Sequence, residues 1–322
     1  MGPYVSHRAE PFPPLAGSAS VCQGVYGEVG NLELVAPDPE DGIWVFWNNT
    51  SRVDVPAGPQ SGQWSGGLRF MQGNRFDAVV VLQSVRGPAF LELVARSGPV
   101  VHRIVWSPEG FAGHGPIASN ACGDPSLLEL PEGQLHALVP TDAEIMHLVA
   151  KPSSYPLLTW KRLPGVSVPA AASVAVSYGA GGGGVWAVAR SGLSGTISRW
   201  NGSWGRPLEL PGRWASMSAA LPAAEGFVVL AADPRGRARR LSLDADGAVL
   251  ADTAIVELEG LRIDTITTCS TTLPGQRIVA LARCGTTLHC FPAPDGLVGA
   301  GGRSRALESR TASVAGGTVH RW

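Results

Sequence analysis

The chain has 322 residues, which is enough for one large domain or two ordinary ones. Its 25 basic and 26 acidic side chains give a formal net charge of −1 and form no runs, which argues against binding to nucleic acids or anionic membranes. Charged residues make up only 16% of the chain while Gly (41) and Pro (26) are abundant, so we expect many turns and short strands, not a helical bundle.

The cysteines and the N-terminal segment bear on cellular location. The five cysteines are odd in number, widely spaced and without a CxxC pair, which argues against a disulfide framework or a zinc site. The first residues contain no apolar core of signal-peptide length, and no segment reaches the ~18 apolar residues of a membrane span. We therefore expect a cytoplasmic protein with reduced thiols, no metal, no cofactor and no membrane partner.

Strand-like segments recur along the chain. The main pattern is an apolar run, a turn with Gly, Pro or Asp, and a second run of alternating apolar and polar residues, which is typical of a β-hairpin. Seven such hairpins are predicted, at residues 34–47, 94–106, 138–148, 188–200, 230–243, 281–291 and 311–322. Six of them follow another short apolar segment, at residues 18–26, 77–85, 125–133, 172–180, 216–224 and 264–272.

The hairpins are copies of one repeat. The string VARSG occurs at Val94 and again at Val188, LARCG follows at Leu281, and the intervening hairpins reduce the spacing to about 47 residues. Three or four short strands per unit of this length fit the blade of a β-propeller, in which neighbouring sheets cover each other's apolar faces. We expect one all-β propeller domain over residues 1–322, with seven blades and six as the alternative. Residues 4–17 resemble the outer half of a repeat, so we expect both chain termini to close the last blade.

The best copy of the repeat, residues 172–212, contains the motifs Val188-Ala189-Arg190, Ser198-Arg199-Trp200 and Trp204. In these motifs the chain resembles the bacterial seven-bladed propeller lectins of the Photorhabdus type and, more distantly, the fungal fucose-binding propellers. The resemblance implies sugar sites between adjacent blades. An indole would stack there on the apolar face of a pyranose while polar groups bind its hydroxyls.

The candidate ligand-binding residues lie on or just after the third strands of the repeats. They are Trp47, His102, Arg103, Trp106, Arg199, Trp200 and Trp204. Trp200 and Trp204 are the best candidates for a sugar platform, because Asn201-Gly202-Ser203 between them is typical of a tight, exposed turn. Aromatic residues at blade periodicity also fit packing between blades. Because the third strands differ from copy to copy, we expect at most two or three sugar pockets.

The divergence of the blades also fits a single-site enzyme of specialised metabolism, a cyclase, lyase or hydrolase with its pocket at the central channel. The polar candidates there are Gln23, Tyr26, Gln83, Glu129, Tyr178 and Ser218. The sequence contains no GxSxG elbow and no Walker loop, and no carboxylate pair is placed for glycoside hydrolysis. A small molecule or a glycan is the expected partner, and catalysis, a scaffold role and the oligomeric state stay open.

Overall fold

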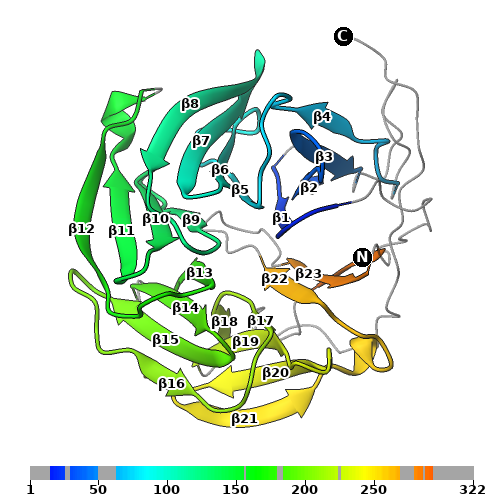
Figure 1. Ribbon diagram of the computed structural model, residues 1–322, viewed down its shortest axis with the longest axis vertical. Coiled ribbons are helices and arrows are strands. Elements are labelled where there is room, and N and C mark those ends of the chain that lie inside the picture. The colour runs from blue at the N-terminus through cyan, green and yellow to red at the C-terminus, as the bar shows by residue number, and fades with distance from the viewer. Residues whose placement is uncertain are drawn as a thin grey trace.

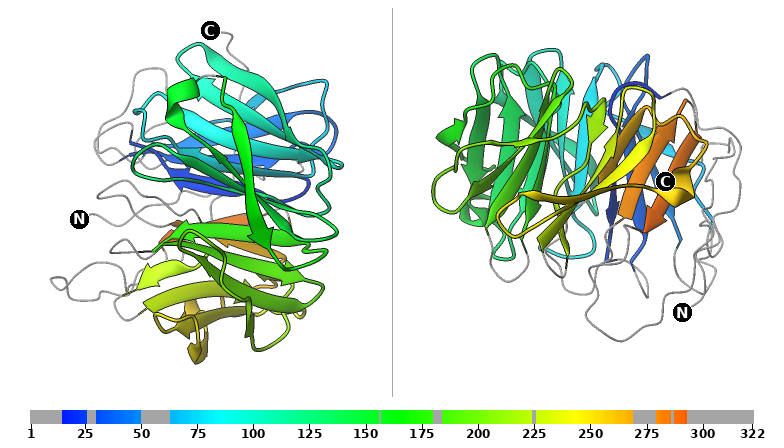
Figure 2. Two further views of the ribbon diagram at one scale, coloured as in Figure 1. Left: turned by 90° about the vertical axis from the view of Figure 1, so that its left-hand side faces the viewer. Right: turned by 90° about the horizontal axis from the view of Figure 1, so that it is seen from below.

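The protein is described by a computed structural model that covers residues 15–25, 30–49, 63–155, 157–179, 184–223, 226–268, 279–285 and 287–292. These residues form six antiparallel sheets, which surround a common centre as the blades of a propeller (Figure 1). Seen from the side, the sheets stand next to one another around the ring (Figure 2). We number the blades one to six in chain order. The all-β propeller and its six-bladed form are therefore confirmed.

The first three blades each have four strands. Blade 1 contains β1 (Ser20–Gln23), β2 (Leu32–Pro37), β3 (Ile43–Asn48) and β4 (Leu68–Phe70). Blade 2 contains β5 (Ala78–Gln83), β6 (Leu91–Ser97), β7 (Val100–Ser107) and β8 (Gly110–Ala118). Blade 3 contains β9 (Ser126–Glu129), β10 (Leu135–Pro140), β11 (Ile145–Ala150) and β12 (Trp160–Val166).

The second half of the ring is less regular. Blade 4 contains β13 (Ser173–Tyr178), β14 (Val185–Ser191), β15 (Ser194–Trp200) and β16 (Leu208–Leu210). Blade 5 contains β17 (Ser216–Met217), β19 (Gly226–Ala232), β20 (Ala238–Leu243) and β21 (Val249–Ala254), and β18 (Leu221–Ala223) pairs with β19. The described strands of blade 6 are β22 (Thr265–Thr268), β23 (Val279–Cys284) and β24 (Thr287–Pro292).

The first strand of each blade lies nearest the centre (Figure 1). Parallel bridges join Ser18 to Ala78 and Asp124 to Ser173, so the innermost strands of neighbouring blades run in the same direction. The hairpins between the second and third strands therefore fall on the same side of the ring, which we call the hairpin face.

The core lies between adjacent blades. Blades 3 and 4, for example, share a cluster to which Leu138, Ile145, Val174 and Ala187 belong, all of them buried. Every second residue of a strand points to the same side of its sheet, so both sides of each blade can be apolar only if a neighbour covers each side. Burial of these side chains, worth about 25 cal/mol per Å² of apolar surface, drives the closure of the ring.

Blade 6 packs directly against blade 1. Leu281 and Leu288 share a buried cluster with Val21 and Leu34, and Arg283 Nη1 donates to the carbonyl of Gly17 over 2.9 Å. The seven-bladed expectation is corrected because this packing closes the ring after six sheets. The hairpin expected at residues 311–322 and residues 4–14 of the N-terminal half-repeat lie outside the described residues, as does Tyr26, so closure by the two termini stays a prediction.

The described helices are 3-10 turns at Pro152–Ser154 and Val256–Leu258. Within the described ranges, no helix has the length and apolar character needed to cross a bilayer. Cys122 and Cys284 are free cysteines.

Candidate functional site

Trp200 and Trp204 lie together between blades 3 and 4, at the end of the strands opposite the hairpin face. Trp200 ends β15, and an antiparallel bridge connects it to Trp204. The expected turn is present: the amide of Asn201 donates to the carbonyl of Ser203 over 3.3 Å, and that of Gly205 donates to Arg199 over 2.8 Å. The local sequence thus brings two half-buried indoles to one edge of blade 4.

Two buried histidines of blade 3 face these indoles. His136 on β10 and His147 on β11 have no exposed surface. The Trp200 ring lies 5.3 Å from the ring of His136 and 5.4 Å from that of His147, each in an edge-to-face arrangement. The Trp204 ring lies 5.5 Å from His147 in the same arrangement. Such contacts are favourable between aromatic rings and fix their relative orientation.

A directed chain of hydrogen bonds runs through this cluster. Trp204 Nε1 can only donate, and it lies 3.3 Å from His147 Nδ1, which must therefore accept. His147 Nε2 then carries a proton and donates it to His136 Nδ1 over 2.9 Å. His136 Nε2 in turn donates to Gln134 Oε1 over 2.9 Å. The indole thus determines the tautomer of both rings, and each imidazole is neutral.

The pKa values of both histidines agree with this assignment. Burial, together with the neighbouring His147, lowers the pKa of His136 to about 3. Burial alone lowers the pKa of His147 to about 4. Desolvation disfavours the charged imidazolium, and a proton on His147 Nδ1 would remove the acceptor of the Trp204 indole. Near neutral pH this chain of hydrogen bonds therefore holds the Trp204 ring in one orientation.

Trp204 borders an open hollow on the outer surface. The hollow is lined by Gly165 and Ser167 of blade 3 and by Trp204, Gly205, Arg206 and Pro207 of blade 4. Ser167 and Arg206 are exposed and carry a hydroxyl and a guanidinium group. A flat aromatic surface with a few polar groups at its rim is suited to a ligand that has one apolar face and hydroxyls around its edge.

The structure separates the other predicted ligand-binding residues from this hollow. Arg199 is exposed, with its guanidinium 5.5 Å from the Trp186 ring. His102 packs edge-on against Phe76 at 6.3 Å. Trp106 is half-buried and its ring lies 6.4 Å from that of Phe111.

Trp47 is also half-buried, and its backbone amide donates to Ser65 Oγ over 3.0 Å. Trp47, His102 and Trp106 thus belong to other parts of the ring. A role for them in ligand binding stays a prediction.

Arg103 forms a buried ion pair. Its Nε and Nη2 lie 2.9 and 2.8 Å from the two carboxylate oxygens of Glu92, and both side chains are at most 2% exposed. Its guanidinium also lies 5.1 Å from the ring of Tyr155 in blade 3. Glu92 and Arg103 of blade 2 occupy the register positions that His136 and His147 occupy in blade 3.

Sequence reasoning missed His136, Gln134, Ser167 and Arg206. The detectable signal was the polar pair at matched positions of the second and third strands: Glu92 with Arg103 in blade 2, His136 with His147 in blade 3. An alignment of the repeats by strand register would have revealed that pair. The contact with Trp204 required the packing of blade 4 against blade 3.

The described channel candidates lie at the ends of the innermost strands, away from the hairpin face. Gln83 Nε2 donates to the carbonyls of Gly87 and Phe90 over 2.8 and 2.9 Å. Glu129 accepts from Ser84 Oγ at 3.2 Å and from the amide of Val85 at 2.8 Å. Burial raises the pKa of Glu129 to about 7, although these two hydrogen bonds oppose the shift. Gln83 and Glu129 thus hold loops of blade 2.

The three remaining described candidates differ in environment. Gln23 is buried at the end of β1, and Tyr178 is half-buried at the end of β13. Ser218 is buried and its hydroxyl accepts from the amide of Leu230 over 2.9 Å.

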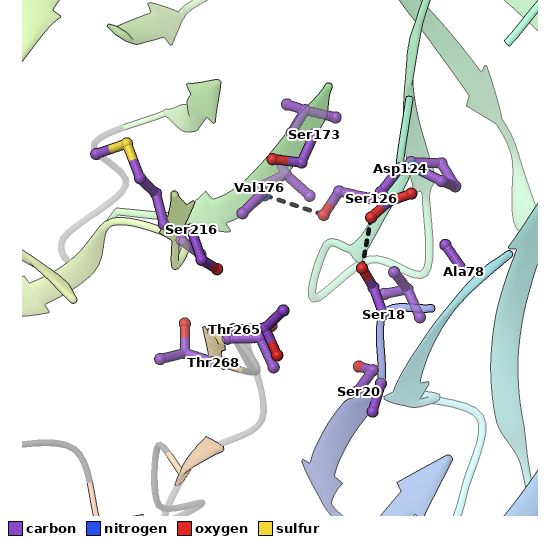
Figure 3. Close-up of a pocket in the computed structure, with 18 of the residues that line it drawn as sticks. Ser18, Ser20, Ala78, Asp124, Ser126, Ser173, Val176, Ser216, Thr265 and Thr268 are labelled. Carbon is purple, nitrogen blue, oxygen red and sulfur yellow. Dashed lines mark hydrogen bonds between the residues drawn. The ribbon is translucent and has the colours of Figure 1, made fainter. Parts of the chain in front are cut away.

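A cavity of about 120 Å³ lies at the centre of the ring toward the hairpin face. Side chains at the beginnings of the innermost strands line it, including Ser18, Asp124, Ser173, Ser216 and Thr265 (Figure 3). Arg190, near the end of the second strand β14, lines it too. Ser18 Oγ donates to Asp124, and the hydroxyls of Ser20, Ser126 and Ser216 accept from backbone amides of the next blade at 3.0 to 3.2 Å. The serines thus connect different blades around the cavity.

The described residues contain no group of three or more His, Cys, Asp or Glu side chains that could hold a metal ion. No protein-family model matches the chain. No curated protein matches it either.

Solved structures match the fold of the chain. The six-bladed fungal lectin from Aleuria aurantia superposes with a TM-score of 0.58 at 12% identity, covering 98% of this chain and 100% of that one. AofleA from Arthrobotrys oligospora gives 0.64 at 11% identity and covers 96% and 94%. The lectin BP39L from Burkholderia pseudomallei gives 0.59 at 15% identity and covers 84% and 79%. The protein is therefore a six-bladed β-propeller with the fold of these lectins.

Proposed function

We propose that the protein is a carbohydrate-binding propeller and that the hollow beside Trp204 is its sugar site. The observation that carries the proposal is the orientation of the Trp204 indole by the hydrogen-bond chain through His147, His136 and Gln134. A ring held at a fixed angle beside an open hollow is preorganised for stacking on a sugar, so little ordering entropy is lost on binding.

The polar rim supports the same proposal. Arg206 supplies a planar donor group for a pair of adjacent hydroxyls, and Ser167 supplies a donor and acceptor on the opposite wall. The solved neighbours include a "fucose-specific lectin" from Aleuria aurantia. A structure of the SapL1 lectin in complex with alpha methyl fucoside is another match, with a TM-score of 0.59 at 12% identity. Fucosides are accordingly the first sugars to test. The Photorhabdus-type resemblance is a second source of support for sugar binding.

The cleft between blades 2 and 3 does not repeat the proposed site. In the neighbouring cleft the ion pair of Glu92 and Arg103 fills the positions of the two histidines. Arg86 and Arg103 of blade 2 both lie over the ring of Tyr155, the aromatic residue that follows β11 as Trp204 follows β15. That cleft is filled by its own side chains, so it lacks the hollow and the free indole face of the proposed site.

The test is titration calorimetry of the full chain with α-methyl-L-fucoside and a panel of other methyl glycosides. Trp204→Ala should weaken binding about tenfold or more, because the stacking surface is removed. Arg206→Ala should have a smaller effect. Trp160→Ala serves as the matched control, because Trp160 is also half-buried but packs into a different cluster between blades 2 and 3. Binding that survives Trp204→Ala, or no binding to any glycoside of the panel, would refute the proposal.

A further inference from the structure

Three arginines occupy one position in alternate blades. Arg96, Arg190 and Arg283 lie near the ends of the second strands, at the hairpin face. In register, Arg96 pairs with Ala78, Arg190 with Ser173 and Arg283 with Thr265.

The first two of these arginines sit in matching hairpins. Arg96 Nη1 donates to the carbonyl of Gly98 over 3.1 Å, and Arg190 Nη1 donates to that of Gly192 over 2.6 Å. The surroundings of Arg96 and Arg190 can therefore be compared position by position.

Two carboxylates compensate the charge of Arg96. Its Nη1 lies 3.1 Å from Asp77 Oδ2 of the same blade, and its Nη2 lies 3.1 Å from Asp124 Oδ1 of blade 3. Asp77 is placed by its amide, which donates to the carbonyl of Arg96 over 2.7 Å. Asp77 also accepts from the amide of Gly98 over 2.8 Å. The half-exposed guanidinium is thus bound on two sides.

Arg190 lacks both carboxylates. Ala172 stands in the position of Asp77, since its amide donates to the carbonyl of Arg190 over the same 2.7 Å. Ser216 of blade 5 stands in the position of Asp124, because each is opposite the end of the second strand of its own blade. Within the described part of the chain, no carboxylate forms an ion pair with Arg190.

One of the two positions that lack a carboxylate, Ser216, borders the central cavity. Arg190, Ser173 and Ser216 all line it, and the hydroxyl-bearing side chains of Ser173 and Ser216 are drawn there in Figure 3. The charged residues among its described lining are Asp124 and Arg190. Asp124 is paired with Arg96, so the guanidinium of Arg190 is the uncompensated charge of this lining. Ser173, Arg190 and Ser216 are half-exposed, so solvent reaches this end of the cavity.

We propose that Arg190 binds a small organic carboxylate from solution at the rim of the central cavity. The ligand takes the place that the carboxylates of Asp77 and Asp124 hold beside Arg96. A guanidinium matches a carboxylate through two parallel N–H···O bonds, and the nearby Ser173 hydroxyl supplies a further donor. A space of about 120 Å³ accommodates an anion of the size of acetate but not an oligosaccharide. This site lies toward the end of the strands opposite the Trp204 hollow and does not depend on sugar binding.

The experiment is an acetate titration of the full chain, followed by calorimetry and by backbone amide shifts, at fixed pH, chloride concentration and ionic strength. Saturable binding is expected, with shifts at Ser173, Arg190 and Ser216. Arg190→Gln should weaken it about tenfold or more, because a charged bidentate contact is lost. Arg213→Gln is the matched control, since Arg213 is an exposed arginine close to the same hairpin, and it should leave the acetate affinity unchanged.

A second variant keeps the test independent of the folding of Arg190→Gln. Ala172→Asp supplies an internal carboxylate at the position of Asp77, so it should abolish acetate binding and raise the thermal midpoint of unfolding. Acetate binding that persists in Ala172→Asp or in Arg190→Gln would overturn the proposal, as would the absence of saturable binding to the native chain. Binding of phosphate or sulfate but not acetate would overturn the assignment of a carboxylate ligand.

Discussion

The indole nitrogen of Trp204 lies 3.3 Å from Nδ1 of His147, and this hydrogen bond joins blade 4 to blade 3. It is the first member of the chain that ends at Gln134, and it requires both imidazoles of the chain to be neutral. The stability of the fold and the orientation of the Trp204 indole therefore both require neutral imidazoles. Changes of pH and substitutions in the hydrogen-bond chain test this requirement.

We predict that His136 and His147 lower the free energy of unfolding as the pH falls through the window between about 6.5 and about 4. The folded pKa values of His136 and His147 lie below the usual histidine value, so in this window the unfolded chain binds more protons than the folded chain. Each histidine should remove about 2 kcal/mol from the free energy of unfolding between about pH 7 and about pH 5. Urea unfolding at a series of pH values measures this dependence.

The control for the pH experiment is His102→Gln, because the His102 ring packs against Phe76 and is not part of the hydrogen-bond chain from Trp204 to Gln134. This variant should keep the same pH dependence. Burial raises the pKa of Glu129 to about 7 and that of Glu33 to about 8, so these carboxylates act in the opposite direction over this window. The histidine contribution is therefore the difference in pH dependence between the native protein and His147→Phe, and the absence of a difference would contradict a neutral, buried His147.

We predict that His147→Phe destabilises the protein by about 1–3 kcal/mol and weakens sugar binding, although it keeps the ring volume. The substitution leaves the Trp204 indole and Nδ1 of the buried His136 without their partners. Gln134→Ala should change stability by only about 0.5 kcal/mol, because this half-exposed end of the chain can be replaced by water. Chemical unfolding of the two variants distinguishes a connected chain from simple packing, for which His147→Phe would be nearly neutral.

We predict that breaking the buried pair of Glu92 and Arg103 on one side costs about 3–5 kcal/mol. Arg103→Met leaves the buried Glu92 carboxylate without its guanidinium, and Glu92→Leu leaves the buried Arg103 guanidinium without its carboxylate. The double variant should recover most of the loss, because an apolar pair of similar volume needs no desolvation of charge. A thermodynamic cycle over the four proteins measures the coupling. If Arg103 instead serves a ligand, the coupling with Glu92 would be small.

We predict that Gly67→Ala costs about 2 kcal/mol or more. Gly67 has a φ of +82°, and an added Cβ would overlap the ring of the fully buried Phe46. Gly73→Ala is the matched control, because Gly73 has a φ of +87° but open space around its Cα. Gly73→Ala should lose only about 1–2 kcal/mol of stability, the cost of placing a Cβ on a backbone with positive φ. Equal losses in the two variants would show that the contact with Phe46 does not matter.

Local patterns in the sequence predicted the parts of the fold that depend on neighbouring residues. The hairpins expected at residues 94–106 and 188–200 correspond to β6 with β7 and β14 with β15, because alternation and turn residues act within a few positions. The turn between Trp200 and Trp204 was predicted for the same reason. The packing of one blade on the next was expected from the apolar character of both sheet faces.

Only the tertiary structure decided the blade number and the composition of the site. Whether the ring contains six or seven blades depends on the angle at which successive sheets pack. That angle arises from contacts between side chains of different repeats. His147 and Trp204 are 57 positions apart, and Arg96 and Asp124 are 28 positions apart. Such partners are set by closure of the ring, which no local pattern encodes. The repeat therefore specified its own hairpin, whereas the contacts between repeats determined where the sequence could bind a ligand.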